Sequence, residues 1–590
     1  MKPVNALVNS VLRMAFGILL VLGMVGQSRA IYADDLDFTE MIRKNTLPNG
    51  VDQSPELYVV YRDDVLTSSN SAATFACSHG FPWEGDTRIP LILYGNGIRW
   101  GVTSKKAASL EDITPTLGRL LGADIPEESD GRVLKEALTL RGMSNGLVKK
   151  LLGPRAAFVF TLDQCRADYL TNPMINPSLR FLRYMVAGRG TSYSQARLSY
   201  AGSRTAVSHT VIGTGATPGI HGIVGNNIRV GNAFPLAFND QPRHSMNMDN
   251  LLVPTFADVM DLAFDNQAKI ISISPYGRAA LGMGGHGASF SLESDKDILL
   301  KLACDVGLSY TNTDYFALPD YLVRTEDNPI RIDEWLSAHY NINLGETNWT
   351  ETTVITDNGP YAPKVFNKIK GPQGRFPDGT PFTFFHPSAK LSATPPQSNY
   401  QRWDASEPYP GNGYFGETMN TPFYQLWAVD MLLMAIEKEG VGLDRIPDLV
   451  YYNFKCLDKV GHKYGVNSPE IYTYLYYVDY CIRKIVWFLN RHIGPDRYVM
   501  VVTADHGAHN AYDDRILYNR ALFDAIEARF GEGIIQNDPN DGNPFDDMLY
   551  LDPAVMSASG TSQEDVAAFI EDTFSDHVYD VYTKDDISIE

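Results

Sequence analysis

Residues 498–507 read YVMVVTADHG, an apolar run of strand-forming residues that ends abruptly in an acid, a histidine and a glycine. A similar run at residues 156–162 (AAFVFTL) ends at Asp163, and a third at residues 449–457 (LVYYNFKCL) ends at Asp458. Continuous apolar strands of this length are typical of a parallel sheet that helices cover on both faces. The three stretches therefore predict an α/β fold with a mostly parallel sheet sandwiched between helices.

Further segments extend this pattern. Strand-like runs occupy residues 89–94 and 269–274. Apolar periodicity, together with start and stop residues, predicts helices over residues 110–121 and 422–439, and another from Pro469 to the stop at Gly494.

The composition is that of a globular protein with a large core. The chain has 590 residues, of which 44% are hydrophobic, 11% aromatic and 20% charged, and this excludes a disordered, collagen-like or disulfide-framework protein. The formal net charge of −20 repels phosphate backbones, so we expect no nucleic-acid coat. A metal-lined or basic pocket is still compatible with a small anion, because net charge describes only the surface average. The five scattered cysteines contain no CxxC motif and predict neither a redox site nor a cysteine zinc site.

The first thirty residues have the features of an export signal. Lys2 and Arg13 supply positive charge around the start of an apolar run at residues 15–26. Residues 28–30 (SRA) then offer small residues at the positions that a signal peptidase reads. The apolar run is shorter than the roughly 20 residues of a membrane-spanning helix, which favours a cleaved signal over an uncleaved anchor. We expect an exported protein, periplasmic or secreted, with no transmembrane span after signal removal.

Three acids stand where the predicted strands end. Ligands of an open parallel sheet bind beyond the carboxyl ends of its strands, so Asp163, Asp458 and Asp505 are expected to lie together. Unpaired carboxylates this close repel one another, so either cations neutralise them or their pKa values rise. His462 and His506 follow two of these acids in DKVGH and DHG, and mixed carboxylate and imidazole ligands suit zinc or manganese better than calcium. Each motif alone is as typical of a turn or a solvated loop, so the prediction depends on the whole set.

A hydroxyl nucleophile is the next candidate. Residues 203–209 read SRTAVSH, and Thr205 stands at the expected start of a helix, where the dipole favours anions. A hydroxyl is a weak nucleophile that metal coordination activates. The alternative use of such a residue is an N-cap before an apolar helix.

Four motifs together resemble the alkaline phosphatase superfamily, in its branch of single-Thr phosphatases and type I phosphodiesterases/nucleotide pyrophosphatases. They are DQCRADYL from Asp163, TAVSH…TGATPGIHGIVGN from Thr205, DKVGHKYG from Asp458 and TADHG around Asp505. The resemblance implies an alkaline-phosphatase-like α/β fold and the hydrolysis of a small phosphate ester, either a monoester or a diester.

The resemblance also implies a two-zinc site, although other divalent metals would suit the same ligands. One ion would be held by Asp163, Asp505, His506 and the Thr205 oxygen. The other would be held by Asp458, His462 and one more histidine. Thr205 would attack phosphorus to give a covalent phosphothreonine, while two ions about 4 Å apart clamp the attacking and leaving oxygens.

Substrate-binding residues carry over as well. Asn226 would bind a phosphoryl oxygen, and residues 274–278 (SPYGR) look like the segment in which some phosphatases of the superfamily carry a Lys and an Arg. Arg278 is retained here as a cationic clamp, but Tyr276 stands at the Lys position. A phenol carries no charge, so the dianionic phosphate of a monoester would be less well neutralised. Tyr276 therefore leaves monoesters and diesters both open.

The last metal histidine of the superfamily follows the DHG motif at a distance, and this chain lacks one in that context. Residues 77–98 and 109–134 instead resemble the family's C-terminal piece, with His79 as the missing ligand. We infer a circular permutation. The alternative is a separate small domain at residues 31–150, in which His79 is an ordinary loop histidine.

The chain then divides into five segments. They are the signal peptide (1–30), a displaced part of the catalytic domain (31–150), the first half of the core (151–309), an insertion or cap (310–420) and the second half of the core (421–590). The abundance of aromatic residues in the fourth segment favours a cap over a linker.

Two other functions are compatible with these residues. Phosphonate or sulfate esters could be hydrolysed at the same site, although the CxPxR-type motif of sulfatases is absent. A catalytically inactive relative that binds metal or ligand is the non-enzymatic alternative, and the retention of all the candidate ligands argues against it. Nothing in the sequence indicates an oligomeric state.

Overall fold

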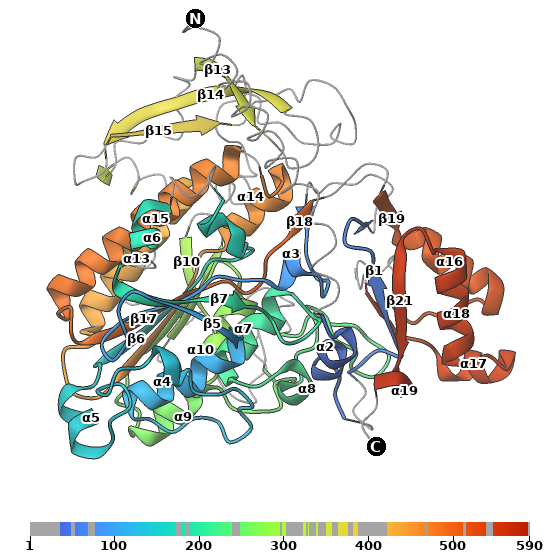
Figure 1. Ribbon diagram of the computed structural model, residues 1–590, viewed down its shortest axis with the longest axis horizontal. Helices are drawn as coiled ribbons and strands as arrows, with labels where there is room; N and C mark the ends of the chain where they lie inside the picture. The colour runs from blue at the N-terminus through green and yellow to red at the C-terminus, as the bar shows by residue number, and fades with distance from the viewer. Residues whose placement is uncertain are drawn as a thin grey trace, which may run out of the picture.

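The computed structural model describes most of the chain and shows a central sheet flanked by helices (Figure 1). The described residues are 36–48, 53–68, 77–172, 179–184, 188–238, 248–288, 290–295, 298–302, 323–325, 328–329, 335, 338–339, 350–356, 364–375, 381–386, 422–467, 469–510, 515–537 and 547–587. The predicted signal peptide and most of the predicted cap at 310–420 lie outside them.

The central sheet has nine strands in the order β10-β9-β8-β16-β6-β17-β4-β7-β5. Their bounds are Ile298–Leu302, Phe290–Asp295, Ile270–Ile273, Asp448–Asn453, Ala156–Thr161, Tyr498–Thr503, Leu91–Gly95, Gly190–Ala196 and Val102–Ala108. Neighbours from β9 to β17 all run parallel, whereas β4 runs antiparallel to both of its neighbours, β17 and β7. The structure therefore confirms the predicted α/β class with a mostly parallel sheet.

Helices cover both faces of this sheet (Figure 1). On one side lie α13 (Pro422–Glu439) and α15 (Pro469–His492), and on the other lie α4 (Ile113–Leu121), α7 (Thr205–Thr214) and α10 (Gly277–Gly284). The bounds of α13, α15 and α4 confirm the helices predicted there, and α4 ends at Gly122, whose φ of +73° suits glycine as a C-cap.

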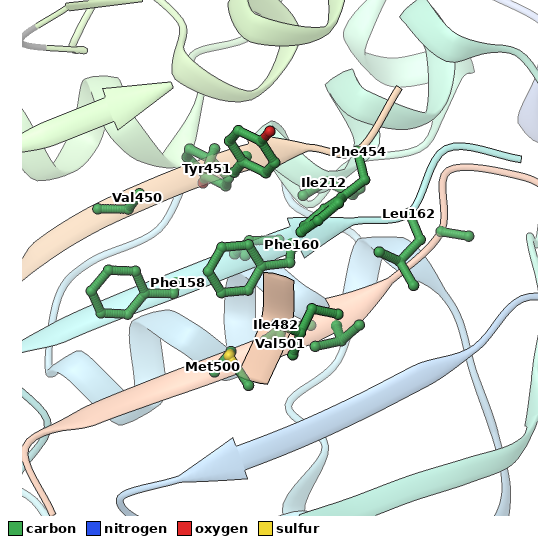
Figure 2. Packing of buried hydrophobic residues seen from close by; sticks show 14 of the residues in the cluster. Phe158, Phe160, Leu162, Ile212, Val450, Tyr451, Phe454, Ile482, Met500 and Val501 are labelled. Atoms are coloured by element: carbon green, nitrogen blue, oxygen red, sulfur yellow. The ribbon is translucent and has the colours of Figure 1, made fainter. Parts of the chain in front are cut away.

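The three central strands form the middle of the main core. Every residue of β6, β16 and β17 is buried. Figure 2 shows Phe158, Phe160, Tyr451 and Met500 of these strands packed together, with Ile482 of α15 beside them. Burying each such side chain contributes about 1.5–3 kcal/mol, and this rigid layer fixes the strand ends that carry the site.

One predicted strand is too long. The sequence predicts a strand over residues 449–457, but β16 ends at Asn453 and α14 (Cys456–Tyr464) begins three residues later. The chain turns because Lys455 adopts helical angles, with φ −62° and ψ −28°. Asp458 therefore lies in the first turn of α14 and not directly at a strand end.

A second, smaller sheet was not foreseen from the sequence. Strand β1 (Leu57–Tyr61) lies between β20 (Met548–Leu549) and β21 (Val578–Thr583) and is antiparallel to both. Helices α16 (Asn519–Phe530) and α18 (Gln563–Thr573) pack on it around a hydrophobic core of their own. Residues from opposite ends of the chain thus share one folding unit.

Three further observations concern the other predictions. Within the predicted cap, β13 (Thr350–Thr356), β14 (Lys364–Arg375) and β15 (Pro381–His386) form an antiparallel sheet. The cysteines in the described part of the chain are all buried free thiols, namely Cys77, Cys165, Cys456 and Cys481. None of the helices that the structure describes combines the length and apolarity needed to cross a membrane.

Candidate metal centre

The predicted acids lie beyond the carboxyl ends of three neighbouring strands, two of them directly and the third through a helix. Asp163 follows β6 by two residues and Asp505 follows β17 by two residues. Asp458 comes from α14, which follows β16. Since β16, β6 and β17 are adjacent, all three carboxylates meet at one edge of the sheet, and each side chain is almost fully buried.

The structure arranges the predicted ligands in two groups. Asp163, Asp505 and His506 form one, and His79, Asp458 and His462 form the other. Within each group, one ligand atom from every residue lies within 4.8 Å of the others. His79, which follows the short strand β3 (Cys77–Ser78), thus joins residues that lie almost 400 positions later in the chain.

Hydrogen bonds fix the tautomer of each imidazole. Nδ1 of His79 lies 2.8 Å from the Ser203 carbonyl oxygen, Nδ1 of His462 lies 2.9 Å from that of Cys77, and Nδ1 of His506 lies 2.9 Å from that of Gly507. A carbonyl oxygen only accepts, so Nδ1 carries the proton in all three rings. In a neutral ring, Nε2 then presents a lone pair, which is the arrangement that metal-binding histidines show.

These Nε2 atoms face carboxylates. The distance from Nε2 to Oδ1 of Asp458 is 3.5 Å for His79 and 3.1 Å for His462. Nε2 of His506 lies 3.2 Å from Oδ2 of Asp505, and both atoms are buried with no hydrogen-bond partner among the described residues. When Asp505 is ionised, two lone pairs face each other in a buried site and repel, whereas a cation bound by both would turn the contact into an attraction.

The electrostatics of the site keep the rings of His79 and His506 neutral. Burial, reinforced by the nearby imidazole of His506, lowers the pKa of His79 to about 3. Burial also lowers the pKa of His506, although Asp163 and Asp458 oppose this effect. Burial, with the negative charge of Asp163, raises the pKa of Asp505. Such a group of neutral imidazoles and crowded carboxylates fits divalent cations of the zinc type.

Gln164 links the two groups and was not singled out from the sequence. Its φ is +63°, which is rare for a residue other than glycine and is typical of functional sites. Its backbone N–H donates to Oδ1 of Asp505 at 3.1 Å, and its Nε2 lies 3.3 Å from both Oδ1 of Asp458 and Nε2 of His462. Gln164 therefore holds members of both groups in fixed positions.

The glycine of the DKVGH motif makes room for this amide. A Cβ atom on Gly461 would lie only 1.9 Å from Oε1 of Gln164. We expect Gly461→Ala to displace the amide and to weaken zinc binding by about 10- to 100-fold, as for other residues that orient metal ligands. Titration against a chromophoric chelator measures this change.

A double-mutant cycle controls for other effects of this substitution. In a Gln164→Ala background the amide is gone, so adding Gly461→Ala should cost little further affinity. Equal losses in both backgrounds, or no loss in either, would contradict the steric explanation.

Thr205 is the first residue of α7 and is 1% exposed. The residue before it, Arg204, is the N-cap, and its side chain makes no capping hydrogen bond. The capping role considered for Thr205 is therefore wrong. Its Oγ1 instead accepts a hydrogen bond of 3.1 Å from Nζ of Lys455, which places the hydroxyl beside the acids of both groups.

Lys455 is the second residue that the sequence analysis missed. It is 1% exposed, and its Nζ lies 3.0 Å from Oδ1 of Asp163 and 2.9 Å from Oδ2 of Asp458. Burial opposes ionisation of both acids, yet the charge of Lys455 is the main reason why their pKa values lie below the ordinary value. The signal in the sequence was a single basic residue inside an otherwise apolar run.

The predicted substrate-binding residues surround the same point. Asn226 accepts a hydrogen bond of 3.0 Å from the backbone N–H of Ala206, next to Thr205. Arg278 lies over the ring of Tyr276 at 4.8 Å, and its Nε is buried without a partner among the described residues. The structure therefore brings every predicted site residue to one region.

This fold and this buried set of acids, imidazoles and a hydroxyl place the protein among the phosphoric ester hydrolases. The chain belongs to the type I phosphodiesterase / nucleotide pyrophosphatase family, whose sequence profile matches residues 157–256 and 333–589. These ranges leave out residues 31–150, so the circular permutation stays a prediction.

Relatives are similar at low identity. A protein named calcium-transporting ATPase from Myroides odoratus is 24% identical over 418 residues, which are 65% of this chain and 67% of that protein. Alkaline phosphatase PafA from Elizabethkingia meningoseptica is 23% identical over 367 residues, 60% of each chain. The chain thus spans about 60% of the length of this phosphatase.

The similarity extends to a solved structure. The crystal structure of alkaline phosphatase PafA matches with a TM-score of 0.50 and 20% identity, and the match covers 72% of this chain and 76% of that one. At this identity the comparison shows the fold alone.

Proposed function

We propose that this protein hydrolyses phosphate esters with Thr205 as nucleophile and two divalent cations as cofactors. Zinc is the cation that we propose first. The observation that carries the proposal is the contact between Nε2 of His506 and Oδ2 of Asp505, two buried atoms 3.2 Å apart with no hydrogen-bond partner in the described part of the chain. A cation held between them satisfies both. In the second group, Nε2 of His79 and Nε2 of His462 likewise face Oδ1 of Asp458, at 3.5 and 3.1 Å.

The residues of the two groups fit such ions. One ion would be held by Asp163, Asp505 and His506 together with the Thr205 oxygen, and the other by His79, Asp458 and His462. When bound, the ions supply Lewis acidity and offset the negative charge of the phosphoryl group.

The reaction follows from the position of Thr205. Its oxygen attacks phosphorus while the bond to the leaving oxygen breaks, and the phosphoryl group is transferred to Thr205. The hydroxyl proton passes to solvent, and the departing alcohol takes up one proton. Water then attacks the phosphothreonine, the bond from phosphorus to Thr205 breaks, and the Thr205 oxygen takes up a proton from the water. The product that leaves is inorganic phosphate when the substrate is a monoester and a phosphate monoester when it is a diester.

Two neighbouring side chains bind the phosphoryl oxygens in this proposal. Asn226 lies next to the start of α7 and presents its amide beside Thr205. Arg278 carries a buried guanidinium nitrogen without a partner among the described residues. Groups that are held in place before the reaction stabilise charge in the transition state without reorganising.

We also infer that residues 31–150 complete the catalytic domain and that the protein is exported. The first inference is supported by β4 and β5, which belong to the central sheet, and by His79, which lies beside Asp458 and His462. Export depends on the predicted signal peptide at residues 1–30, which lies outside the described residues.

Zinc content tests this set of ligands. Protein loaded with zinc and then desalted should retain two ions per chain, because at least three protein ligands hold each ion. His79→Ala removes one ligand from the second group only, and we expect its zinc content to fall toward one ion per chain. Elemental analysis gives the stoichiometry directly.

His577→Ala is the matched control, since His577 belongs to neither group. It should keep both ions. Retention of two ions with full hydrolysis of an aryl phosphate in His79→Ala would remove His79 from the ligand set and would leave the permutation without its main support.

A further inference from the structure

Lys455 is a buried cation that has no role in the reaction proposed above. Its ammonium group donates to three oxygens, one each from Asp163, Asp458 and Thr205, at 2.9 to 3.1 Å. These partners belong to the first ligand group, the second ligand group and the nucleophile. An ammonium group has three N–H donors, so each donor has a defined partner at the centre of the site.

A buried ammonium group such as that of Lys455 needs partners that offset the cost of removing it from water. An isolated ammonium group is expensive to bury and is usually paired where it occurs. The carboxylates of Asp163 and Asp458 supply that pairing here. The third donor, however, is directed at a neutral hydroxyl, at the atom that becomes bonded to phosphorus in the proposed reaction. A charge held at this point would interact with the oxygens of the phosphoryl group.

Tyr276 stands where a lysine would supply a positive charge, and Lys455 lies near its ring. The ring of Tyr276 lies 5.6 Å from Nζ of Lys455 and 4.8 Å from the guanidinium carbon of Arg278. The ring thus has these two cations within cation–π range, one from the N-cap of α14 and one from α10. Tyr276 carries no charge itself, but Arg278, Lys455 and Lys459 lie beside its ring. Lys455 differs from Lys459 in that it also donates a hydrogen bond to Thr205.

We propose that Lys455 is a catalytic residue that binds the phosphoryl group, and that the substrates of this site are phosphate monoesters. The proposal depends on the hydrolytic function proposed above and specifies its substrate class. It answers the question that Tyr276 leaves open, because the missing positive charge is supplied by a lysine from a different helix.

The charge of the substrate gives the reason. A monoester carries a terminal phosphate with three non-bridging oxygens and up to two negative charges, whereas a diester carries two such oxygens and one charge. Hydrogen bonds between charged groups are about twice as strong as neutral ones. An additional ammonium group beside Thr205 therefore stabilises the monoester more than the diester, and the same holds for inorganic phosphate, the product.

The test compares Lys455→Met and Lys455→Gln with the wild type, all loaded with zinc. The Gln variant keeps a hydrogen-bond donor without the charge. It tests the loss of the charge independently if the Met variant folds poorly. We measure kcat/KM for an aryl phosphate monoester and for an aryl phosphate diester, the affinity for inorganic phosphate by calorimetry, and the zinc content.

We expect the wild type to favour the monoester. Both variants should lose about 100-fold on the monoester, the size of effect seen when one transition-state donor is removed, but less than about tenfold on the diester. Phosphate should bind at least about tenfold more weakly, while the zinc content stays at the wild-type value.

Lys459→Met is the matched control. Lys459 lies one turn along the same helix, with its Nζ 5.0 Å from the Tyr276 ring, and it makes no hydrogen bond or ion pair with Thr205 or the ligand groups among the described residues. Its loss should leave the ratio of monoester to diester rates unchanged.

Two results would overturn the inference. One is an equal loss on both esters with unchanged phosphate affinity in the Lys455 variants, and the other is a wild-type preference for the diester. A zinc-loaded wild type that hydrolyses neither ester would instead refute the proposed function, and a wild type that also binds no phosphate would refute both.

Discussion

Replacing Thr205 by Ala is expected to reduce hydrolysis of an aryl phosphate by at least about 10³-fold, because the substitution removes the atom that attacks phosphorus. The hydroxyl lies at the start of α7, and it is buried within hydrogen-bond distance of Lys455. Steady-state rates of the zinc-loaded variant, measured beside the wild type, give the size of the loss.

Two further measurements separate loss of the nucleophile from loss of the site. Thr205→Ser retains a hydroxyl and should retain most of the activity, and Thr205→Ala should still bind zinc through the six remaining ligands. Acid quench of the wild type during turnover should trap phosphothreonine, which mass spectrometry would locate at Thr205. Turnover of Thr205→Ala at the normal rate would refute the assignment.

Removal of the metal ions is expected to have the second large effect. Chelation should abolish hydrolysis and also lower the melting temperature, because it leaves buried lone pairs of His506 and Asp505 facing each other. A ligand present at 100 times its Kd stabilises the folded state by about 2.7 kcal/mol, and two ions act at this site. Calorimetry of the zinc-loaded and metal-free protein measures the difference.

Restoring the metal provides the control for this experiment. Zinc or manganese should recover activity and stability, whereas calcium should recover little of either, since the ligands include three imidazoles and calcium prefers oxygen. Full activity in the metal-free protein would contradict the two-ion proposal, and an unchanged melting temperature would contradict the electrostatic reason given for it.

The parts of this site that could be predicted are those with a local signature. An apolar run followed by an acid marks a buried strand and its carboxyl end, so Asp163 and Asp505 could be placed from ten residues each. Their meeting follows from sheet geometry, because parallel strands end on the same edge. His79 could be named only through its resemblance to a displaced family segment.

Gln164 and Lys455 could not be predicted, because their roles arise from tertiary contacts. Gln164 acts through a left-handed backbone conformation, and no glycine beside it in the sequence indicates that conformation. Lys455 lies in a run whose hydrophobicity continues across a turn, so the periodicity favours one long strand over a strand and a helix. The small sheet around β1 could not be predicted for a related reason, since β1 and its partner β21 lie about 500 residues apart in sequence.

The position of β4 has a consequence for the order in which the chain folds during synthesis. Its partner β17 leaves the ribosome roughly 400 residues later, which at about 5–20 residues per second is a wait of roughly 20–80 s. Throughout that time β4 can pair only with its other neighbour, β7, so one edge of this apolar strand stays open to aggregation. The late strand β17 thus delivers both Asp505 and the second partner of β4, so the candidate site and the central sheet are completed together.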